Sequence, residues 1–373
     1  MEVEILQENL LKGVSAVSRF VVSRPSLPVL GMILIKTDGG KLSLSATNMD
    51  TGVEIKVGAK VEKEGGVVVP AKLMQEYVGF LPAGKVKLSV SGGVLELVAS
   101  GRKAKITGME AAEFPELPKI AGGEACRVAV ADLEKVIKLV SFAASSDETR
   151  PVLSALLIKV KQGKMEVVAT DGYRLSLIRG VAVAGKKNEA KVLVNARVVE
   201  ELVRLAREEE GEGVEVVFGG EHKSVVFRVG AVVLTTRVID GEYPAYEKII
   251  PGTEEVLVEG NREEMLEAVR STAIFARESS NIVKWEIGAK GLVMKANSAG
   301  LGEQESVVEV ELKQGEGGSI AFNCRFLVEL LGSMDDERVQ FAMSGSLAPG
   351  VFKTQEKGFV HVVMPVRVQG EGD

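Results

Sequence analysis

The sequence predicts an α+β protein made of three similar domains, each with two helices packed on antiparallel sheet. The first observation is a repeat, because strand, amphipathic helix, loop and two strands occur three times in the 373 residues. The last strand of each copy ends in a related string, at Ala46-Thr-Asn, Ala169-Thr-Asp and Ala296-Asn-Ser. The copies lie about 125 residues apart, which exceeds solenoid repeat lengths and indicates domain triplication. The second observation is that another strand, helix and set of strands follows each copy, so six half-domains are expected.

The first half of each domain begins with a short alternating strand, at residues 3–6, 126–130 and 256–259. Apolar residues at helical spacing then predict helices over residues 8–20, 132–143 and 261–276. Two strands follow each helix, expected at residues 32–36 and 41–47, 153–160 and 164–170, and 282–287 and 291–297.

The second half of each domain opens on Val67, Val192 or Ile320 and continues into an amphipathic helix of about three turns. Asn195 and Asn323 stand before two of these helices as N-cap residues. Asn261, followed by Glu264, resembles a capping box at the start of a first-half helix.

Clusters of turn residues set the expected domain boundaries. Lys119-Ile-Ala-Gly-Gly-Glu closes the first domain and Ile250-Pro-Gly-Thr-Glu-Glu closes the second. The predicted domains are residues 1–122, 123–252 and 253–368, with residues 369–373 as a flexible polar tail.

Composition excludes several classes of protein. The net charge of −6 argues against a protein coated in positive charge, although not against a local basic surface. Two distant cysteines, Cys126 and Cys324, and two histidines, His222 and His361, offer no metal site and no disulfide framework. The acidic N-terminus is no signal peptide, and no apolar run approaches the ~20 residues that span a membrane. We therefore expect a cytoplasmic protein without a cofactor.

The sequence lacks the usual marks of an active site. It contains no Walker-type phosphate loop and no Gly-x-Ser-x-Gly elbow. Asp171 could be a catalytic carboxylate, but an Asp before Gly172 is far more often a turn residue. An enzyme is disfavoured, and an Asp171-centred enzyme remains a rival hypothesis.

Positive charges recur on the expected helices, among them Lys12, Arg19, Lys135, Lys138 and Arg204. The ordinary explanation is a solvated helix face, which nearby glutamates support. If all six helices lined one surface, however, modest charge on each would sum to a basic track. Arg24 and Arg150, each before a proline in equivalent loops, suit phosphate contacts.

The chain closely resembles the bacterial sliding clamp, the beta subunit of DNA polymerase III. The matching strings fall in order along nearly the whole chain: Arg24-Pro-Ser-Leu-Pro-Val-Leu30, Asp147-Glu-Thr-Arg-Pro151, Ala169-Thr-Asp-Gly-Tyr-Arg-Leu175, Asp240-Gly-Glu-Tyr-Pro244, Phe322-Asn323 and Val363-Met-Pro-Val-Arg367.

The resemblance implies the DNA clamp fold, in which two subunits join head to tail as a homodimeric ring of six similar domains. Helices would line the hole, and double-stranded DNA would thread it with weak contacts that ignore sequence. An acidic exterior with a basic lining would let such a ring slide. The DNA-facing positions carried over are Arg24 and Arg150, with Lys72 and Arg197 as further candidates.

The resemblance also implies a cleft between the second and third domains for short linear motifs of the replicative DNA polymerase, the clamp loader and repair proteins. The matching residues are Leu153, Thr170, Gly172, Tyr173, Arg174, Leu175, Pro244, Lys248, Ile249, Asn323, Phe326, Val362, Met364, Pro365, Val366 and Arg367. Leu175, Ile249, Val362 and Met364 would form an apolar slot, and Arg174 and Asn323 would bind the peptide backbone. The alternative explanation for Met364-Pro365 is an ordinary terminal β-strand with Pro at its edge and no role in binding. Tyr173 stands where many members have His, and Lys248 where Arg is common, so partner preference stays open.

Ring closure has candidates of its own. By family position, the basic strand with Arg102, Lys103 and Lys105 would meet the third domain of the other subunit. The residues expected there are Ile274, Phe275, Glu303 and Glu305. Lysine on an edge strand also protects against aggregation, which is the ordinary alternative. A solitary peptide-binding scaffold that never encircles DNA is the remaining rival.

Overall fold

The computed structural model describes residues 1–117, 124–185, 189–209, 211–219, 223–278, 280–298, 300 and 302–367. The chain forms two compact units. The first contains Met1–Val130, Val183–Lys186 and Arg197–Val238, and the second contains Ala131–Ala182, Lys187–Ala196 and Ile239–Asp373. The central third of the sequence therefore contributes strands to both units.

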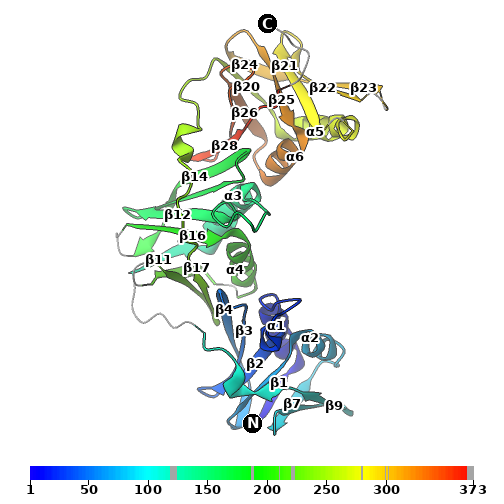
Figure 1. Ribbon diagram of the computed structural model, residues 1–373, viewed down its shortest axis with the longest axis vertical. Coiled ribbons are helices and arrows are strands. Elements are labelled where there is room, and N and C mark those ends of the chain that lie inside the picture. The colour runs from blue at the N-terminus through cyan, green and yellow to red at the C-terminus, as the bar shows by residue number, and fades with distance from the viewer. Residues whose placement is uncertain are drawn as a thin grey trace. The chain divides into compact units, whose positions relative to one another are not determined.

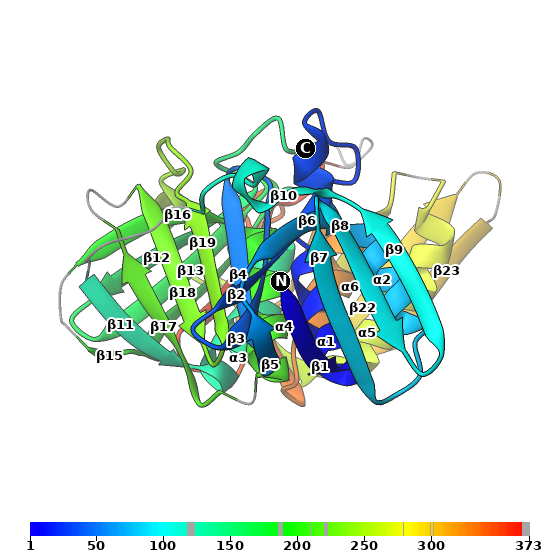
Figure 2. The same cartoon turned by 90° about the horizontal axis from the view of Figure 1, so that it is seen from below.

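The first unit holds two antiparallel sheets (Figures 1 and 2). The ten-stranded sheet has the order β10 (Met109–Glu110), β6 (Gly66–Pro70), β2 (Met32–Asp38), β3 (Lys41–Thr47), β4 (Thr51–Val57), β19 (Val232–Arg237), β18 (Ser224–Val229), β17 (Gly213–Phe218), β11 (Glu124–Ala129) and β15 (Ala184–Gly185). The five-stranded sheet has the order β5 (Lys60–Lys63), β1 (Glu2–Leu6), β7 (Lys85–Ser91), β8 (Val94–Ala99) and β9 (Arg102–Thr107).

The second unit also holds two antiparallel sheets. The nine-stranded sheet has the order β16 (Ala190–Asn195), β12 (Ala155–Lys161), β13 (Lys164–Thr170), β14 (Arg174–Ala182), β28 (Phe359–Val363), β27 (Gly350–Lys353), β26 (Arg338–Met343), β20 (Val256–Asn261) and β24 (Val310–Gln314). The four-stranded sheet has the order β23 (Gly302–Val308), β22 (Gly291–Ser298), β21 (Ile282–Gly288) and β25 (Gly318–Asn323).

Six α-helices occur in the described residues: α1 (Gln7–Ser18), α2 (Ala71–Gly79), α3 (Val130–Val140), α4 (Ala196–Glu208), α5 (Arg262–Ala276) and α6 (Cys324–Ser333). Helices α1 and α2 pack together, as do α5 and α6. Among the helices of these residues, none is long and apolar enough to cross a membrane. The α+β fold class is thus as predicted.

Most expected elements occur with small shifts in their ends. Strands β3 and β13 have the predicted bounds. The strand expected from Leu153 begins at Ala155, because Leu153 and Ser154 donate to the Arg150 carbonyl in a turn, at 3.0 and 3.2 Å. Helix α3 ends at Val140, and a 3₁₀ turn covers the remaining residues to Ala143. The proposed N-cap Asn261 is confirmed, since its side chain accepts from the Glu263 and Glu264 amides at 2.9 and 3.2 Å.

An aromatic core stabilises the third repeat. Trp285 is fully buried, and its ring lies edge-on to Phe322, Phe341 and Phe352 at centroid distances of 5.7, 5.1 and 5.9 Å. Edge-to-face packing of this kind adds about 0.5–1.5 kcal/mol per pair to the gain from burial. These rings join β21, β25, β26 and β27, so the core links both sheets of the second unit.

The predicted domain limits fall only partly on residues that the structure describes. The boundary at residues 122 and 123 and the tail at residues 369–373 lie outside the described residues. Each compact unit contains a sheet whose strands come from two predicted domains. In the first unit β4 pairs with β19, and in the second unit β14 pairs with β28. The limits 1–122, 123–252 and 253–368 therefore stay a prediction.

Candidate functional site

The turn between β13 and β14 is built by its own side chains. The Asp171 Oδ1 atom accepts hydrogen bonds from the backbone amides of Tyr173 and Arg174 at 2.8 and 3.0 Å. The Thr170 hydroxyl donates to the Arg174 carbonyl at 2.6 Å and accepts from the Gly172 amide at 3.1 Å. Gly172 has a φ of +94°, which a residue with a Cβ adopts only under strain. Asp171 is thus a turn-forming residue, as the sequence favoured, and Tyr173 stands at the tip with 61% of its surface exposed.

The C-terminal segment lies beside this hairpin although it is far away in sequence. Strand β28 pairs antiparallel with β14 (Figure 1). Leu175 lies opposite Val362 in this pair. The Met364 amide donates to the Tyr173 carbonyl at 2.9 Å, and the Val366 amide donates to the Ala321 carbonyl at 2.8 Å. Residues 362–367 are therefore fixed between the hairpin and β25.

The residues expected to form an apolar slot divide into buried and more exposed ones. Leu175 and Val362 are each 1% exposed and pack in one cluster with Tyr243 and Tyr246. Ile249 is half-buried against the same cluster, and Met364 is 40% exposed. Of the remaining candidates, Leu153, Pro244, Pro365 and Val366 are half-buried, whereas Lys248 and Arg367 are exposed.

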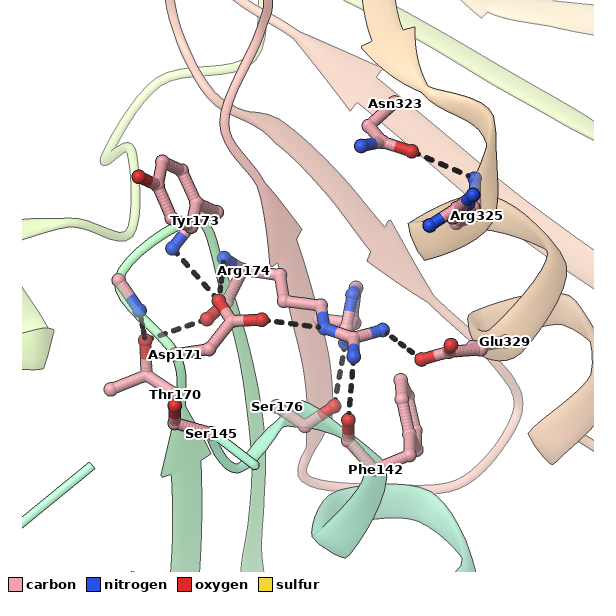
Figure 3. A network of polar contacts seen from close by, with 12 residues as sticks. Phe142, Ser145, Thr170, Asp171, Tyr173, Arg174, Ser176, Asn323, Arg325 and Glu329 are labelled. Atoms are coloured by element: carbon pink, nitrogen blue, oxygen red, sulfur yellow. Dashed lines mark hydrogen bonds and ion pairs between the residues drawn. The ribbon is translucent and has the colours of Figure 1, made fainter. Parts of the chain in front are cut away.

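Arg174, which is expected to bind the peptide backbone, has several partners within the chain. Its guanidinium forms ion pairs with Asp171 at 3.1 Å and Glu329 at 2.5 Å, and donates to the Phe142 carbonyl at 2.7 Å (Figure 3). It also lies over the rings of Phe142 and Phe326, at 5.3 and 4.7 Å. Arg174 is therefore a buried brace from the hairpin to α6, and this role depends on a partner 155 positions away.

The start of α6 carries two further candidate residues. The Asn323 Oδ1 atom accepts from the Arg325 amide at 3.0 Å, which confirms the predicted N-cap (Figure 3). Phe326, in the first turn, is half-buried against Arg174. Asn195, the other expected N-cap, stays a prediction.

A polar cluster that the sequence did not indicate lies under the segment carrying Pro244, Lys248 and Ile249. Tyr246 donates to Glu166, and Lys159 donates to the Tyr246 hydroxyl at 2.5 Å. Burial is the main reason that the pKa of Tyr246 rises to about 12. Burial also acts to raise the pKa of Glu166, but hydrogen bonds from Tyr246, Arg179 and Lys159 together hold that pKa below its usual value. The cluster fixes the 3₁₀ turn Tyr246–Lys248 against β12 and β13.

A second unforeseen pair joins β14 to β28. The Ser176 hydroxyl and His361 Nδ1 are 2.5 Å apart, and His361 is fully buried. The imidazole stacks on Phe142 at 5.4 Å. Burial, aided by the charge of Arg174, lowers the pKa of His361 well below its usual value. No periodicity predicts such a pair, because it forms only when two distant strands become neighbours.

The proposed DNA-facing residues lie on the surface. Arg24, Lys72 and Arg197 are exposed. Arg150 is about half exposed and forms an ion pair with Asp147 at 3.1 Å. Each can meet a phosphate, although Arg150 would share its charge with Asp147.

Counted over their whole length, the described helices carry no net positive charge. Five of the six described helices, α1 to α4 and α6, carry equal numbers of acidic and basic residues, and α5 carries one more acidic residue. Lys12 also pairs with Glu209 at 3.0 Å, and Arg19 with Glu208 at 3.1 Å. A basic track along the helices would therefore require that basic side chains face it and acidic ones face away, or that loop residues supply positive charge.

The proposed ring-closure residues lie on two sheet edges. Lys103 and Lys105 are exposed on β9 and lie 3.0 and 3.8 Å from Glu96 of the neighbouring strand. Arg102 donates to the Phe80 carbonyl. Glu303 and Glu305 are exposed on β23, and on α5 Ile274 is 53% exposed while Phe275 is half-buried.

Comparison with known proteins gives one consistent family. Models of the N-terminal, central and C-terminal domains of the DNA polymerase III beta subunit match residues 1–118, 127–245 and 247–367. The beta sliding clamp of Synechocystis sp. is 30% identical and aligns with 97% of this chain and 98% of its own. A Bacillus subtilis sliding clamp structure has a TM-score of 0.93 at 25% identity and covers 99% of each chain. A Bartonella birtlesii clamp solved with griselimycin has a TM-score of 0.93 at 27% identity, covering 99% of this chain and 100% of its own. The chain belongs to the family of DNA polymerase III beta subunits, the beta sliding clamps.

Proposed function

We propose that two copies of this chain close head to tail into a ring that encircles duplex DNA and tethers a DNA polymerase to it without catalysing a reaction. The hydrogen bonds of the Asp171 carboxylate support the non-catalytic part, because its oxygens serve the turn and Arg174. Tethering by a closed ring requires no sequence-specific contact, so a few phosphate-binding residues suffice.

We place the tethering site at the joint between the hairpin and the C-terminal segment. The observation that carries this proposal is the pairing of β14 with β28, which sets Tyr173 and Met364 above the buried floor of Leu175 and Val362. Such a surface suits an extended peptide with apolar side chains. Methionine adapts to varied partners, as a shared tether for the polymerase, the clamp loader and repair proteins would require.

Arg24 and Arg150 are the proposed phosphate contacts, with Lys72 and Arg197 as further candidates. Their exposure supports this role, because a side chain must reach solvent to meet DNA. The balanced charge of the helices suits sliding, since a strongly basic surface would hold DNA in place.

Two measurements test the proposal. The loaded protein should stay on nicked circular DNA and leave when the circle is cut, because topology holds it. A solitary peptide-binding scaffold would show no difference between the two DNA forms. A fluorescent clamp-binding peptide should also bind and be displaced by griselimycin, the ligand of the Bartonella birtlesii structure. Binding that M364E leaves unchanged would remove the cleft from the proposal.

A further inference from the structure

A stack of side chains runs from the buried His361 to Phe326 at the proposed peptide site. The imidazole of His361 stacks on the Phe142 ring, with centroids 5.4 Å apart and planes 23° apart. The Arg174 guanidinium lies 5.3 Å from the centroid of the same Phe142 ring and 4.7 Å from that of Phe326 (Figure 3). Side chains from β28, the 3₁₀ turn Ser141–Ala143, β14 and α6 therefore form one continuous contact, the ring stack.

The inner end of the ring stack suits a neutral imidazole only. His361 is fully buried, its Nδ1 atom lies 2.5 Å from the Ser176 hydroxyl, and its Nε2 atom has no hydrogen-bond partner among the residues that the structure describes. A neutral imidazole has one N–H donor, which the Ser176 hydroxyl can accept at Nδ1. An imidazolium has two, so it would bury an unpaired donor together with a charge.

The elements packed around His361 add to the preference for the neutral ring. The 3₁₀ turn contributes Phe142, β27 contributes the Phe352 ring at 6.5 Å, and β14 contributes Ser176 and the charged Arg174. Burial and the positive charge of Arg174 both lower the pKa of His361. The carboxylates of Asp171 and Glu329 are already paired with Arg174, which keeps its charge in place.

The first unit contains a joint of the same construction. The Asn48 Oδ1 atom accepts from the backbone amides of Asp50 and Thr51 at 3.1 and 2.7 Å, as Asp171 does for the two residues that follow Gly172. Strand β4 then pairs with β19 as β14 pairs with β28. The two turns and the strands that leave them are therefore equivalent residue by residue.

The equivalent joint is aliphatic where the ring stack begins. Counted from the two turns, Val53 corresponds to Ser176. Val53 lies opposite Leu234, whereas Ser176 lies opposite His361. Both aliphatic residues are fully buried, so two aliphatic side chains suffice to join strands at this position. The polar pair of the second joint therefore needs another explanation, and that joint is the one at which we place the tethering site.

We infer that neutral His361 is a positioning residue for the proposed peptide site and that it acts through Phe142. This inference rests on the proposed tethering function and adds to it a residue that is too deeply buried to touch a peptide. Protonation would drive the imidazole out of its buried position, and Phe142 would lose its stacking partner. Arg174, which lies over Phe142 and bonds to its carbonyl, would then no longer hold Phe326 in place. Peptide binding and protonation of His361 therefore oppose each other.

The pH at which peptide affinity changes follows from the lowered pKa of His361. The folded chain holds the ring neutral at pH 6.5, so the dissociation constant should be the same at pH 7.5 and 6.5. Below the pKa of the folded chain the dissociation constant should rise, by at most about tenfold per pH unit, because one proton is involved. A histidine with an unperturbed pKa of about 6.5 would place this rise at higher pH.

Peptide titrations from pH 7.5 to 4.5 test the inference. The probe is a fluorescent clamp-binding peptide with blocked ends and without His, Asp or Glu, so that it does not titrate, and circular dichroism identifies the pH values at which the chain is folded. The variant S176A/H361F keeps a ring on Phe142 that cannot be protonated, so its dissociation constant should not depend on pH. A rise of equal size in this variant and the parent, or a constant value in the parent, would overturn the inference. A parent that binds no peptide at pH 7.5 would instead refute the tethering site, and this inference with it.

F142L tests whether the ring stack transmits the effect. It leaves His361 titratable but removes the ring that links it to Arg174. Peptide affinity at pH 7.5 should fall about threefold to tenfold, the effect of one lost aromatic contact, and its dependence on pH should disappear. A purely structural role for Phe142 would lower affinity and leave the parental pH profile, which would contradict the proposed path.

NMR of the imidazole gives a readout that does not depend on affinity. The chain contains two histidines, and the resonance that is missing from H361Q belongs to His361. Peptide should shift this resonance and lower the pKa of His361 further in the parent, because bound peptide favours the neutral ring. The same peptide should change neither quantity in F142L. A His361 resonance that peptide leaves unchanged in the parent would overturn the inference.

Discussion

Arg174 connects the hairpin to α6 through contacts that are mostly shielded from water. Its guanidinium meets Asp171, Glu329, the Phe142 carbonyl and two aromatic faces. A buried arginine with this many partners contributes more to the free energy of folding than to ligand binding. Removing it leaves several polar groups without hydrogen-bond partners.

We predict that R174A lowers the free energy of unfolding by about 2–4 kcal/mol, since it removes buried hydrogen bonds and ring contacts. R174K should recover only part of this loss, because an ammonium cannot reproduce the planar fork. Urea denaturation measures both values. The control is R325A, an exposed residue of α6, which should change stability by less than about 0.5 kcal/mol. A loss of similar size in both variants would show that Arg174 is not the brace.

His361 makes stability depend on pH in a direction that follows from its lowered pKa. The folded protein holds the imidazole neutral, so below the ordinary pKa of 6.5 the unfolded chain binds more protons. Stability is then fully present above about pH 7 and falls as the pH drops below 6.5, by up to about 1.4 kcal/mol per pH unit from this group.

The measurement is urea denaturation at pH 5.5 and 7.5. H361Q should remove most of the difference between the two values. An unchanged difference in H361Q would assign the pH dependence to other groups.

At the scale of elements, we propose that the hairpin and the C-terminal segment form one binding surface. Deleting residues 364–373 removes Met364 and the backbone hydrogen bonds to Tyr173 and Ala321. We predict that this deletion abolishes peptide binding, because the rim of the slot is lost while its buried floor remains. Fluorescence anisotropy measures the binding, and sedimentation should show the same oligomeric state as the parent.

The matched control is deletion of residues 369–373 alone, which leaves Met364–Arg367 in place and should preserve peptide affinity. Loss of affinity in this shorter deletion would mean that the tail, and not the Met364 segment, carries the binding.

At the scale of the whole molecule, the helices provide no net positive charge, so loop residues should dominate contact with DNA. We predict that R24A/R150A weakens DNA association and lowers the magnitude of the logarithmic salt slope by up to about 2, since each phosphate contact contributes about 0.9. Binding titrations over a range of salt concentrations measure this slope. K41A, an exposed lysine at the β2–β3 hairpin, serves as the control. A double variant with the parental slope would remove both arginines from the DNA-facing set.

The sequence by itself determined what depends on neighbours in the chain. Helical and alternating periodicity located the helices and strands, Asp171-Gly172 located the turn, and Asn261 and Asn323 located two caps, because each signal lies within a few residues. The repeat in turn determined the number of similar domains.

Only the tertiary structure decided which distant strands became neighbours. The pairing of β14 with β28 buried His361 against Ser176, committed Arg174 to Glu329 and set Tyr173 beside Met364. The pairing of β4 with β19 likewise joins strands from different thirds of the sequence. Backbone pairing joins residues by position across a sheet, and a single sequence carries no local pattern from which that partnership can be worked out.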